Sequence, residues 1–340
     1  MRPVKVAESN CPNLETTTGV NGVRISRFEQ DGQTKLGFYF DSFVVELAAA
    51  ATAYNQANSA TLDFSDTSCI LKYLPPEGAL AADAELVASW LSENDICDSL
   101  KTCCDTVQLL VPIARPNKLF LLAGNYSAHV QEGGEQGIER AETFPYVFMK
   151  PPTTTLTNPG QPIQIPKVNP NEVDWELELA IVIGKKGKHI SEADALDYVA
   201  GYTVINDISD RAYHPFPERK ERSRDAFFDW LHGKWHDSFC PCGPCIATPT
   251  CIPDPQTLDL KLSFNGDLRQ NSTTALQVFP VAAVIEFISQ SVTLEPGDII
   301  STGTPDGVGK TTGTFIKAGD TLDAFISSIG TLTSTAIDEA

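Results

Sequence analysis

Carboxylates and bulky apolar side chains alternate between positions 173 and 184. The acidic members are Asp174, Glu176 and Glu178, and an aliphatic run closed by Gly184 follows them. Because successive side chains of a β-strand point to opposite faces, the pattern predicts a strand with its carboxylates on one face, roughly 7 Å apart. Oxygen ligands with no nearby cysteine or histidine suit Mg²⁺, with Mn²⁺ or Ca²⁺ as alternatives. A solvent-exposed acidic strand is the other interpretation.

A histidine and a glutamate three residues apart form a second candidate for chemistry. On a helical turn, His129 and Glu132 would share one face. A carboxylate beside an imidazole fixes its tautomer and makes it a better base, which is the composition of a general base. An incidental pair on a surface helix is the alternative. Further along, the segment 201–207 predicts a strand ending at Asp207, whose carboxylate could join the acidic strand and complete a three-carboxylate site.

Two segments invite functional interpretations that the sequence leaves open. The loop 303–311 resembles a phosphate-binding P-loop, but five residues rather than four separate Gly303 from Gly309, and Pro305 removes an amide. We therefore reject nucleotide binding and keep the loop as a candidate for backbone contacts with an anionic ligand. Residues 208–239 combine a run of mixed charges with flanking aromatic residues, which fits either a solvated surface or a lid over a site.

The nine cysteines do not form an evident disulfide framework, because their number is odd and they are spread along the chain. Cys240, Cys242 and Cys245 have the spacing C-x-C-x-x-C, but no second pair of cysteines or histidines follows to complete four zinc ligands. We therefore interpret this cluster as small buried residues in a tight turn.

The overall composition is that of a globular chain. The 340 residues are enough for two domains, and the net charge of −19 argues against nucleic acids and anionic membranes as partners. No apolar run approaches the length of a bilayer span, and no signal-peptide pattern begins the sequence. We expect a soluble, cytoplasmic protein.

The predicted secondary structure is mainly β. A proline-containing connector near residue 115 predicts an N-terminal accessory domain over 1–115 and a second domain over 116–340. The expected elements are a hairpin turning at Asp31-Gly32, helices over 48–57 and 80–91, strands over 118–124, 163–165 and 321–326, a short helix capped by Ser191, a hairpin turning at Asn265-Gly266, and a helix beginning at Pro280.

Six short motifs follow one another between about residues 120 and 330. They are Asn125-Tyr126-x-x-His129-x-x-Glu132, Asp174-x-Glu176-x-Glu178, Asn206-Asp207-Ile208-Ser209-x-Arg211, Gly233-Lys234-x-x-Asp237-x-Phe239-x-Pro241, Asn265-Gly266-x-x-Arg269-Gln270, and Gly297-Asp298-x-Ile300-x-Thr302-Gly303-Thr304-Pro305-x-Gly307-Val308-Gly309. Together they resemble the fumarylacetoacetate hydrolase family. The resemblance implies an α+β, predominantly β fold, a mixed β-sandwich roll with a smaller N-terminal accessory domain, and a homodimer.

The resemblance also implies roles for individual residues. The implied ligands of a divalent cation are Glu176, Glu178 and Asp207. The implied catalytic residues are His129 and Glu132, which would activate water, and Lys234, which would offset negative charge. The implied substrate-binding residues are Arg211, His214 and Thr304. Ala212 and His214 stand where the family often has Asp and Gln, so His214 leaves the reaction and the substrate open.

On this basis we expect a divalent-metal-dependent hydrolase that cleaves a carbon–carbon bond in a 1,3-dicarbonyl compound or an acylpyruvate. Mg²⁺ would stabilise the enolate, and water activated by His129 would attack the distal carbonyl. The same metal site could instead isomerise, tautomerise or decarboxylate a 2-hydroxymuconate-like or 2-oxo acid substrate. A non-catalytic binder that kept the scaffold is a further alternative. In every case the expected partner is a small molecule, with no nucleic acid and no membrane.

Overall fold

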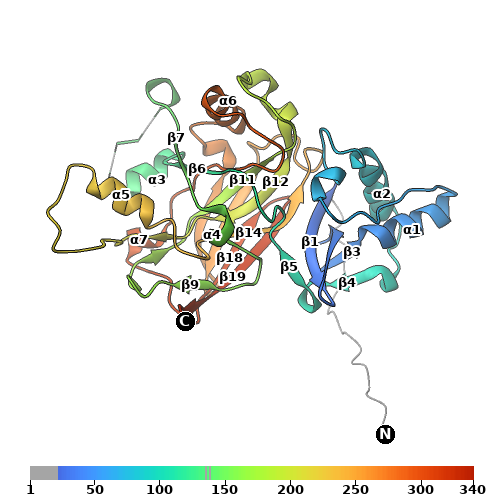
Figure 1. Ribbon diagram of the computed structural model, residues 1–340, viewed down its shortest axis with the longest axis horizontal. Helices are drawn as coiled ribbons and strands as arrows, with labels where there is room; N and C mark the ends of the chain where they lie inside the picture. The colour runs from blue at the N-terminus through green and yellow to red at the C-terminus, as the bar shows by residue number, and fades with distance from the viewer. Residues whose placement is uncertain (1–21, 135, 138) are drawn as a thin grey trace, which may run out of the picture.

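The computed structural model describes residues 22–134, 136–137 and 139–340. Within them the chain forms a large and a small β-sheet with helices around their edges, which confirms the predominantly β, α+β fold (Figure 1). The strands of the large sheet are β1 (Arg24–Gln30), β2 (Gln33–Tyr39), β3 (Phe43–Glu46), β4 (Lys101–Cys103), β5 (Gln108–Leu110), β6 (Leu119–Ala123), β7 (Tyr146–Met149), β8 (Leu156–Thr157), β11 (Leu177–Ile183), β12 (Val199–Asn206), β14 (Cys240–Ala247) and β17 (Ile299–Ser301).

The smaller sheet packs against one face of the large one. Its strands are β9 (Ile163–Ile165), β15 (Asp259–Phe264), β16 (Asp267–Thr273), β18 (Thr321–Ile326) and β19 (Gly330–Asp338), and a separate ladder joins β10 (Val173–Asp174) to β13 (Ser209–Asp210). The helices are α1 (Leu47–Asn58), α2 (Ala81–Glu93), α3 (Ser127–Glu132), α4 (Pro152–Thr155), α5 (Asp225–His232), α6 (Val281–Ser291) and α7 (Gly309–Thr312). The 3-10 helices are Ile70–Tyr73, Asp98–Leu100, Cys104–Thr106, Arg140–Glu142, Glu192–Tyr198 and Thr274–Leu276.

The N-terminal strands continue the large sheet. The β1–β2 hairpin turns at Asp31 and Gly32, both with positive φ as a tight two-residue turn requires. Strand β1 then pairs antiparallel with β14, with Arg24 opposite Ala247. The predicted boundary near residue 115 therefore separates segments that share one continuous sheet, and it stays a prediction. In Figure 1 the N-terminal elements β1 to β4, α1 and α2 lie together on one side of the molecule.

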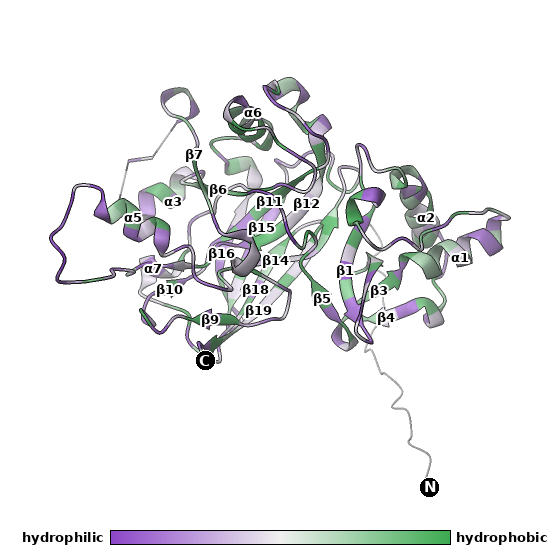
Figure 2. Cartoon of the chain, in the orientation of Figure 1, coloured by the Kyte–Doolittle hydropathy of each residue, from purple (hydrophilic) through white to green (hydrophobic). Residues whose placement is uncertain are grey.

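The central strand β11 is buried on both faces. Its odd-numbered apolar residues pack toward the smaller sheet, whereas Ala180 and Val182 pack into a second core with α1 and α2. The sequence of a strand that is covered on both sides is a continuous run of hydrophobic residues. Figure 2 shows hydrophobic residues along the central strands, whereas the long loop before α5 is mostly hydrophilic. The expectation of one unbroken strand with an acidic face needs correction, because the ladder is interrupted between Asp174 and Leu177.

The three closely spaced cysteines lie in a strand and not in a tight turn. All eight residues of β14 are buried, and β14 pairs with β12 and β1 in the middle of the large sheet. The misprediction has a physical cause, since Pro241 and Pro244 are rare in central strands and point to a turn. Here the ladder between β12 and β14 contains a register shift near Val204, and the Gly243–Pro244 peptide is cis.

Most other predicted elements are confirmed, with two differences. The helix capped by Ser191 is a 3-10 helix, with the Ser191 hydroxyl accepting from the Asp194 amide at 3.3 Å. Strand β18 is followed by β19, which the sequence analysis missed. No helix among the described residues combines the length and the hydropathy needed to cross a bilayer.

Candidate active site

Three buried carboxylates meet at one end of the paired strands β11 and β12. Leu177 lies opposite Asn206 in this antiparallel ladder, so Glu178 at the start of one strand and Asp207 just past the end of the other reach the same edge. The Glu176 amide donates to the Asn206 side chain at 2.9 Å, which holds the residue before β11 at this edge. One oxygen from each of Glu176, Glu178 and Asp207 lies within 4.8 Å of the others.

Glu178 has one oxygen bound by the protein and one without a partner. Its Oε2 accepts from the Ser301 hydroxyl at 2.6 Å and from the Gly303 amide at 2.8 Å. Its Oε1 is buried and has no hydrogen-bond partner among the described residues. Burial, and then the charges of Asp207 and Glu176, raise the pKa of Glu178 well above its ordinary value. An unpartnered oxygen beside two further carboxylates is where a cation would bind.

Two cations hold Glu176 in place. Lys234 Nζ bridges Glu176 at 2.8 Å and Asp207 at 2.7 Å. Arg211 forms ion pairs with Glu176 at 2.7 Å and with Asp174 at 2.8 Å. Burial alone would raise the pKa of Glu176, but the charges of Lys234, Arg211 and then His129 lower it below its ordinary value. Burial would likewise lower the pKa of Lys234, but the charges of Asp207 and Glu176 raise it. These contacts keep Glu176 ionised.

Lys150 is a site residue that the sequence analysis missed. It is buried, and its ammonium donates to the Asp207 carboxylate, to the Ile208 carbonyl at 2.9 Å and to the Phe239 carbonyl at 2.6 Å. The lysine therefore fixes the segment that carries Asp207. A lysine followed by two prolines gives little local signal of this role, because its three acceptors lie more than fifty residues away along the chain.

We expect Lys150→Met to lower the free energy of unfolding by about 3–5 kcal/mol, the range for removing one partner of a buried ion pair. The methionine would fill most of the space but would leave the Asp207 oxygen and two carbonyls without their donor. Urea denaturation followed by circular dichroism measures the loss. Lys188→Met is the matched control, because Lys188 is exposed and its ammonium makes only a 3.4 Å contact, to the Ser291 carbonyl, within the described part of the chain. Equal stability of the two variants would contradict the anchoring role.

The two residues of the candidate general base are in contact, as their spacing in the sequence predicts. His129 and Glu132 lie on α3, with His129 Nδ1 2.8 Å from Glu132 Oε1, and both side chains are about one-fifth exposed. The second Glu132 oxygen accepts from the Gly307 amide at 3.0 Å. A carboxylate fixed in this way selects the imidazole tautomer that leaves Nε2 free to take a proton. Because the Gly303 amide donates to Glu178 and the Gly307 amide to Glu132, this short loop links the dyad to the carboxylates.

The loop that resembled a P-loop binds the chain's own carboxylates. The Gly303 amide donates to Glu178, the Gly307 amide to Glu132, and the amide of Gly309 to Asp174 at 2.6 Å. These amides were the candidate contacts for an anionic ligand, but the anions that they bind are the protein's own side chains. The loop 303–310 therefore connects the carboxylate cluster, the base and the ion pair of Arg211.

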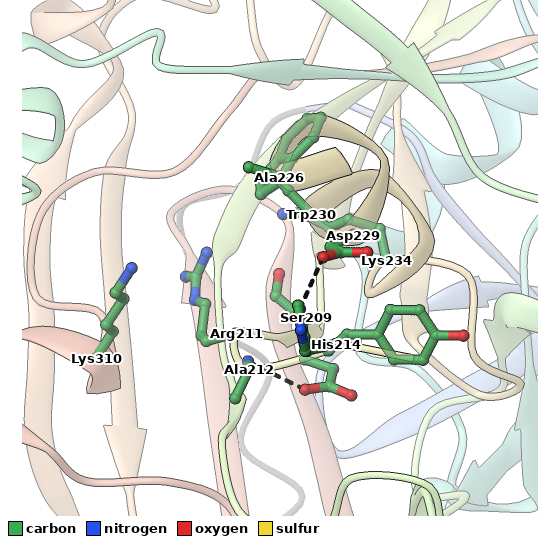
Figure 3. A pocket seen from close by; sticks show the side chains of 11 residues that line it. Ser209, Arg211, Ala212, His214, Ala226, Asp229, Trp230, Lys234 and Lys310 are labelled. Atoms are coloured by element: carbon green, nitrogen blue, oxygen red, sulfur yellow. Dashed lines mark hydrogen bonds and ion pairs between the residues drawn. The ribbon is translucent and has the colours of Figure 1, made fainter. Parts of the chain in front are cut away.

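A cavity of about 350 Å³ is bordered by the two cations that pair with Glu176. Its wall includes three of the predicted site residues, Arg211, His214 and Lys234, together with Lys310 (Figure 3). His129, Glu132 and Thr304 lie outside that wall. Thr304 is buried, and its hydroxyl accepts from Gln270 at 2.9 Å. Because Gln270 also accepts from the Leu177 amide at 3.0 Å, Thr304 is part of the support of β11.

His214 belongs to the segment that the sequence left between a solvated surface and a lid. Its Nδ1 is 3.1 Å from Asp229 on α5, and Arg219 pairs with the same carboxylate. The base of this segment is packed inward, since Trp230 lies edge-on to Phe148 with 5.0 Å between ring centroids. The segment thus covers one side of the cavity while its outer loop stays polar (Figure 2).

The donor set fits a hard divalent cation. Three carboxylates converge, one of their oxygens is buried without a partner, and the nearby groups include no cysteine or histidine ligand among the described residues. Glu176, Glu178 and Asp207 are the residues that would hold the ion.

Comparison with known proteins agrees with the fold and with the family resemblance. The family model described as the fumarylacetoacetate (FAA) hydrolase C-terminal domain matches residues 118–337. The chain is 41% identical over 233 residues, 68% of its length and 69% of the relative's, to an oxaloacetate tautomerase, fahd2, of Xenopus laevis. It is 38% identical over 224 residues to a 2,4-didehydro-3-deoxy-L-rhamnonate hydrolase of a Sphingomonas strain, covering 65% of this chain and 73% of that protein.

Solved structures show the same fold over nearly the whole chain. A maleylpyruvate hydrolase of Sphingobium, in complex with manganese(II) and pyruvate, superposes with a TM-score of 0.67 at 29% identity, covering 93% of this chain and 100% of that one. A 5-carboxymethyl-2-hydroxymuconate delta-isomerase of Mycobacterium smegmatis superposes with a TM-score of 0.64 at 29% identity, covering 93% and 99%.

The fold and the converging carboxylates define a class of metal-dependent enzymes that act on small molecules. The chain belongs to the fumarylacetoacetate hydrolase family, as its motifs predicted. Members with these similarities include tautomerases, isomerases and hydrolases, so the family alone leaves the reaction open.

Proposed function

We propose that this protein is a divalent-metal-dependent tautomerase that moves a proton between the carbon next to the carbonyl group of a 2-oxo acid and the oxygen of its enol. The observation that carries the proposal is the His129–Glu132 dyad, which the amides of loop 303–310 link to a cluster of three buried carboxylates. The oxaloacetate tautomerases of Xenopus laevis and Bacillus subtilis, 41% and 38% identical to this chain, support this reaction over cleavage.

Each part of the site has a defined task in this reaction. A divalent cation held by Glu176, Glu178 and Asp207 would supply the Lewis acidity that favours an enolate. His129 takes the proton from carbon through Nε2 and delivers it to the oxygen of the enolate, or carries it in the reverse direction, while Glu132 stabilises the imidazolium that forms. Lys234 keeps Glu176 and Asp207 in position through both ion pairs. The loop 303–310 donates amides to both Glu132 and Glu178 and so links the base to the carboxylate cluster.

Hydrolysis of a carbon–carbon bond in an acylpyruvate is the second candidate. The same dyad can deprotonate water as well as carbon, and hydrolases are among the relatives and the solved structures. Hydrolysis additionally requires a water molecule positioned for attack, whereas tautomerisation requires only a proton carrier. Because tautomerisation requires fewer groups in the site than hydrolysis, we place it first.

We expect the purified protein to accelerate the decay of oxaloacetate enol, measured by its ultraviolet absorbance, and to release no pyruvate from acetylpyruvate. Treatment with EDTA followed by desalting should lower the rate by at least about a hundredfold, because enolate stabilisation by the ion is worth several kcal/mol. Added Mg²⁺ or Mn²⁺ should restore it. Pyruvate release from acetylpyruvate without enol turnover would establish the hydrolase instead, and a rate unaffected by EDTA would contradict both candidates.

A further inference from the structure

We propose that Lys310 is a specificity-determining residue that binds the second carboxylate of a dicarboxylic 2-oxo acid. This inference rests on the proposed function for the position of the reacting end of the substrate. It goes beyond that function because it assigns a substrate class and a residue that reads it. Lys310 lies on α7, directly after the loop that holds the carboxylates, and it lines the cavity beside Arg211 (Figure 3).

The other charged groups of the cavity wall already have protein partners. Lys234 binds Glu176 and Asp207, and Arg211 binds Asp174 and Glu176. The acidic side chains of the wall have partners as well. Asp229 pairs with Arg219 and His214. Asp210 accepts from Asn169 and from the Ala212 amide, and His236 lies 3.3 Å from it. The charges of Lys234 and Arg211 are therefore already balanced by carboxylates of the protein.

Lys310 differs from these groups. Its ammonium forms no hydrogen bond or ion pair with any residue in the part of the chain that the structure describes, although it borders the same cavity. An unpaired cation at the wall of a small cavity attracts an anion, and a charge-assisted hydrogen bond to a carboxylate is stronger than one between neutral groups. Because the net charge of the protein is −19, an anionic ligand needs a local positive charge at its binding site.

The position of Lys310 is fixed although its side chain is exposed. Its backbone amide donates to Asp174 at 3.1 Å, and the same carboxylate binds Arg211 at 2.8 Å. Asp174 therefore sets the spacing between Lys310 and the ion pairs that lead to Glu176. In Figure 3 Lys310 lies on one side of Arg211, whereas Asp229 and Lys234 lie on the other. A 2-oxo acid whose reacting end is at the carboxylate cluster would direct its far end into this cavity.

The size of the cavity agrees with a short acid. Its volume of about 350 Å³ is at the lower end of the range of roughly 300–1,000 Å³ for small-molecule sites. Because the amide and not the ammonium of Lys310 holds α7, substitution of the side chain leaves the local backbone contacts in place. The residue can thus be tested without disturbing the fold.

The binding experiment compares two acids of equal length, 2-oxoglutarate and 2-oxopentanoate, which differ only in the distal carboxylate. Titration calorimetry with the Mg²⁺-loaded protein should show the dicarboxylate bound about tenfold more tightly, the expected scale for one partly exposed charge-assisted hydrogen bond. Lys310→Met should abolish the difference and Lys310→Arg should keep most of it. Lys317→Met, at an exposed lysine outside the cavity, should leave it unchanged. Equal affinity of the wild-type protein for both acids, or no effect of Lys310→Met, would overturn the proposal.

A turnover experiment separates this proposal from the proposed function. Lys310→Met should lower kcat/KM for oxaloacetate enol about tenfold, mainly through KM, and should change the value for acetylpyruvate enol less than twofold. Lysine-dependent binding without any turnover would refute the tautomerase and support the role of Lys310. Turnover of oxaloacetate that Lys310→Met does not alter would support the tautomerase and refute the role of Lys310.

Discussion

Replacing Glu178 by glutamine should reduce metal-dependent turnover by at least about a thousandfold. The glutamine has the shape of the glutamate, and its oxygen can still accept from Ser301 and Gly303. It removes one of three charges, however, and it places an amide NH₂ group where Glu178 Oε1 has no partner. Two hydrogen-bond donors facing a cation would repel it, and losing several kcal/mol of charge stabilisation corresponds to about three powers of ten in rate.

The measurement must separate loss of the site from loss of the fold. Burial and the two neighbouring carboxylates disfavour the charged form of Glu178, since they raise its pKa. We therefore expect the metal-free Glu178→Gln variant to melt at the same temperature as the metal-free wild type or above it, while calorimetry shows weaker Mg²⁺ binding. Glu93→Gln, at an exposed position near the end of α2, is the matched control and should alter neither quantity. Full metal-dependent turnover in Glu178→Gln would exclude the carboxylate cluster as the metal site.

Replacing His129 by asparagine should lower kcat by about 10²–10⁴-fold, the usual contribution of a positioned acid–base group. Asparagine can still hydrogen-bond to Glu132 but cannot accept and return a proton. Because the three residues that would hold the ion are Glu176, Glu178 and Asp207, the affinity for Mg²⁺ should change little in this variant. Glu132→Gln should have a smaller effect, on the order of 10–100-fold, because it keeps the imidazole in place but no longer stabilises its charged form.

The control for this substitution is His189→Asn. His189 is exposed and has a φ of 54°, a backbone conformation that asparagine tolerates better than most residues. Stopped-flow measurement of enol decay should show the loss of rate in the His129 variant and a wild-type rate in His189→Asn. An unchanged rate in the His129 variant would show that proton transfer uses another group.

Local patterns in the sequence were sufficient to predict the secondary-structure elements and the contacts between residues that lie close along the chain. Alternation and turn chemistry predicted the hairpins at Asp31-Gly32 and Asn265-Gly266, because these depend on neighbouring residues alone. The spacing of His129 and Glu132 predicted their contact for the same reason, since residues three apart meet on a helical turn. The motif order predicted the family.

The same kind of pattern failed where distant segments decide the outcome. The alternation of Asp174, Glu176 and Glu178 suggested one acidic face, but the ladder breaks after Asp174, which binds Arg211 and the amides of α7. Only Glu176 and Glu178 of the three converge with Asp207. Burial of these acids is tolerated because cations from other segments pair with them, and no window of the sequence contains both partners.

The sequence by itself determined which chemical groups this protein has: three carboxylates suited to a hard cation, a histidine with its glutamate, and a loop rich in glycine. The tertiary structure alone decided where their charges are balanced. Lys150 and Lys234 reach Asp207 from different segments, and the amides of loop 303–310 bind Glu132 and Glu178. The ammonium of Lys310 is left at a cavity wall without a partner among the described residues. The physical reason is that the energy of a buried charge depends on every group within a few ångströms, and those groups come together only when the sheets have formed.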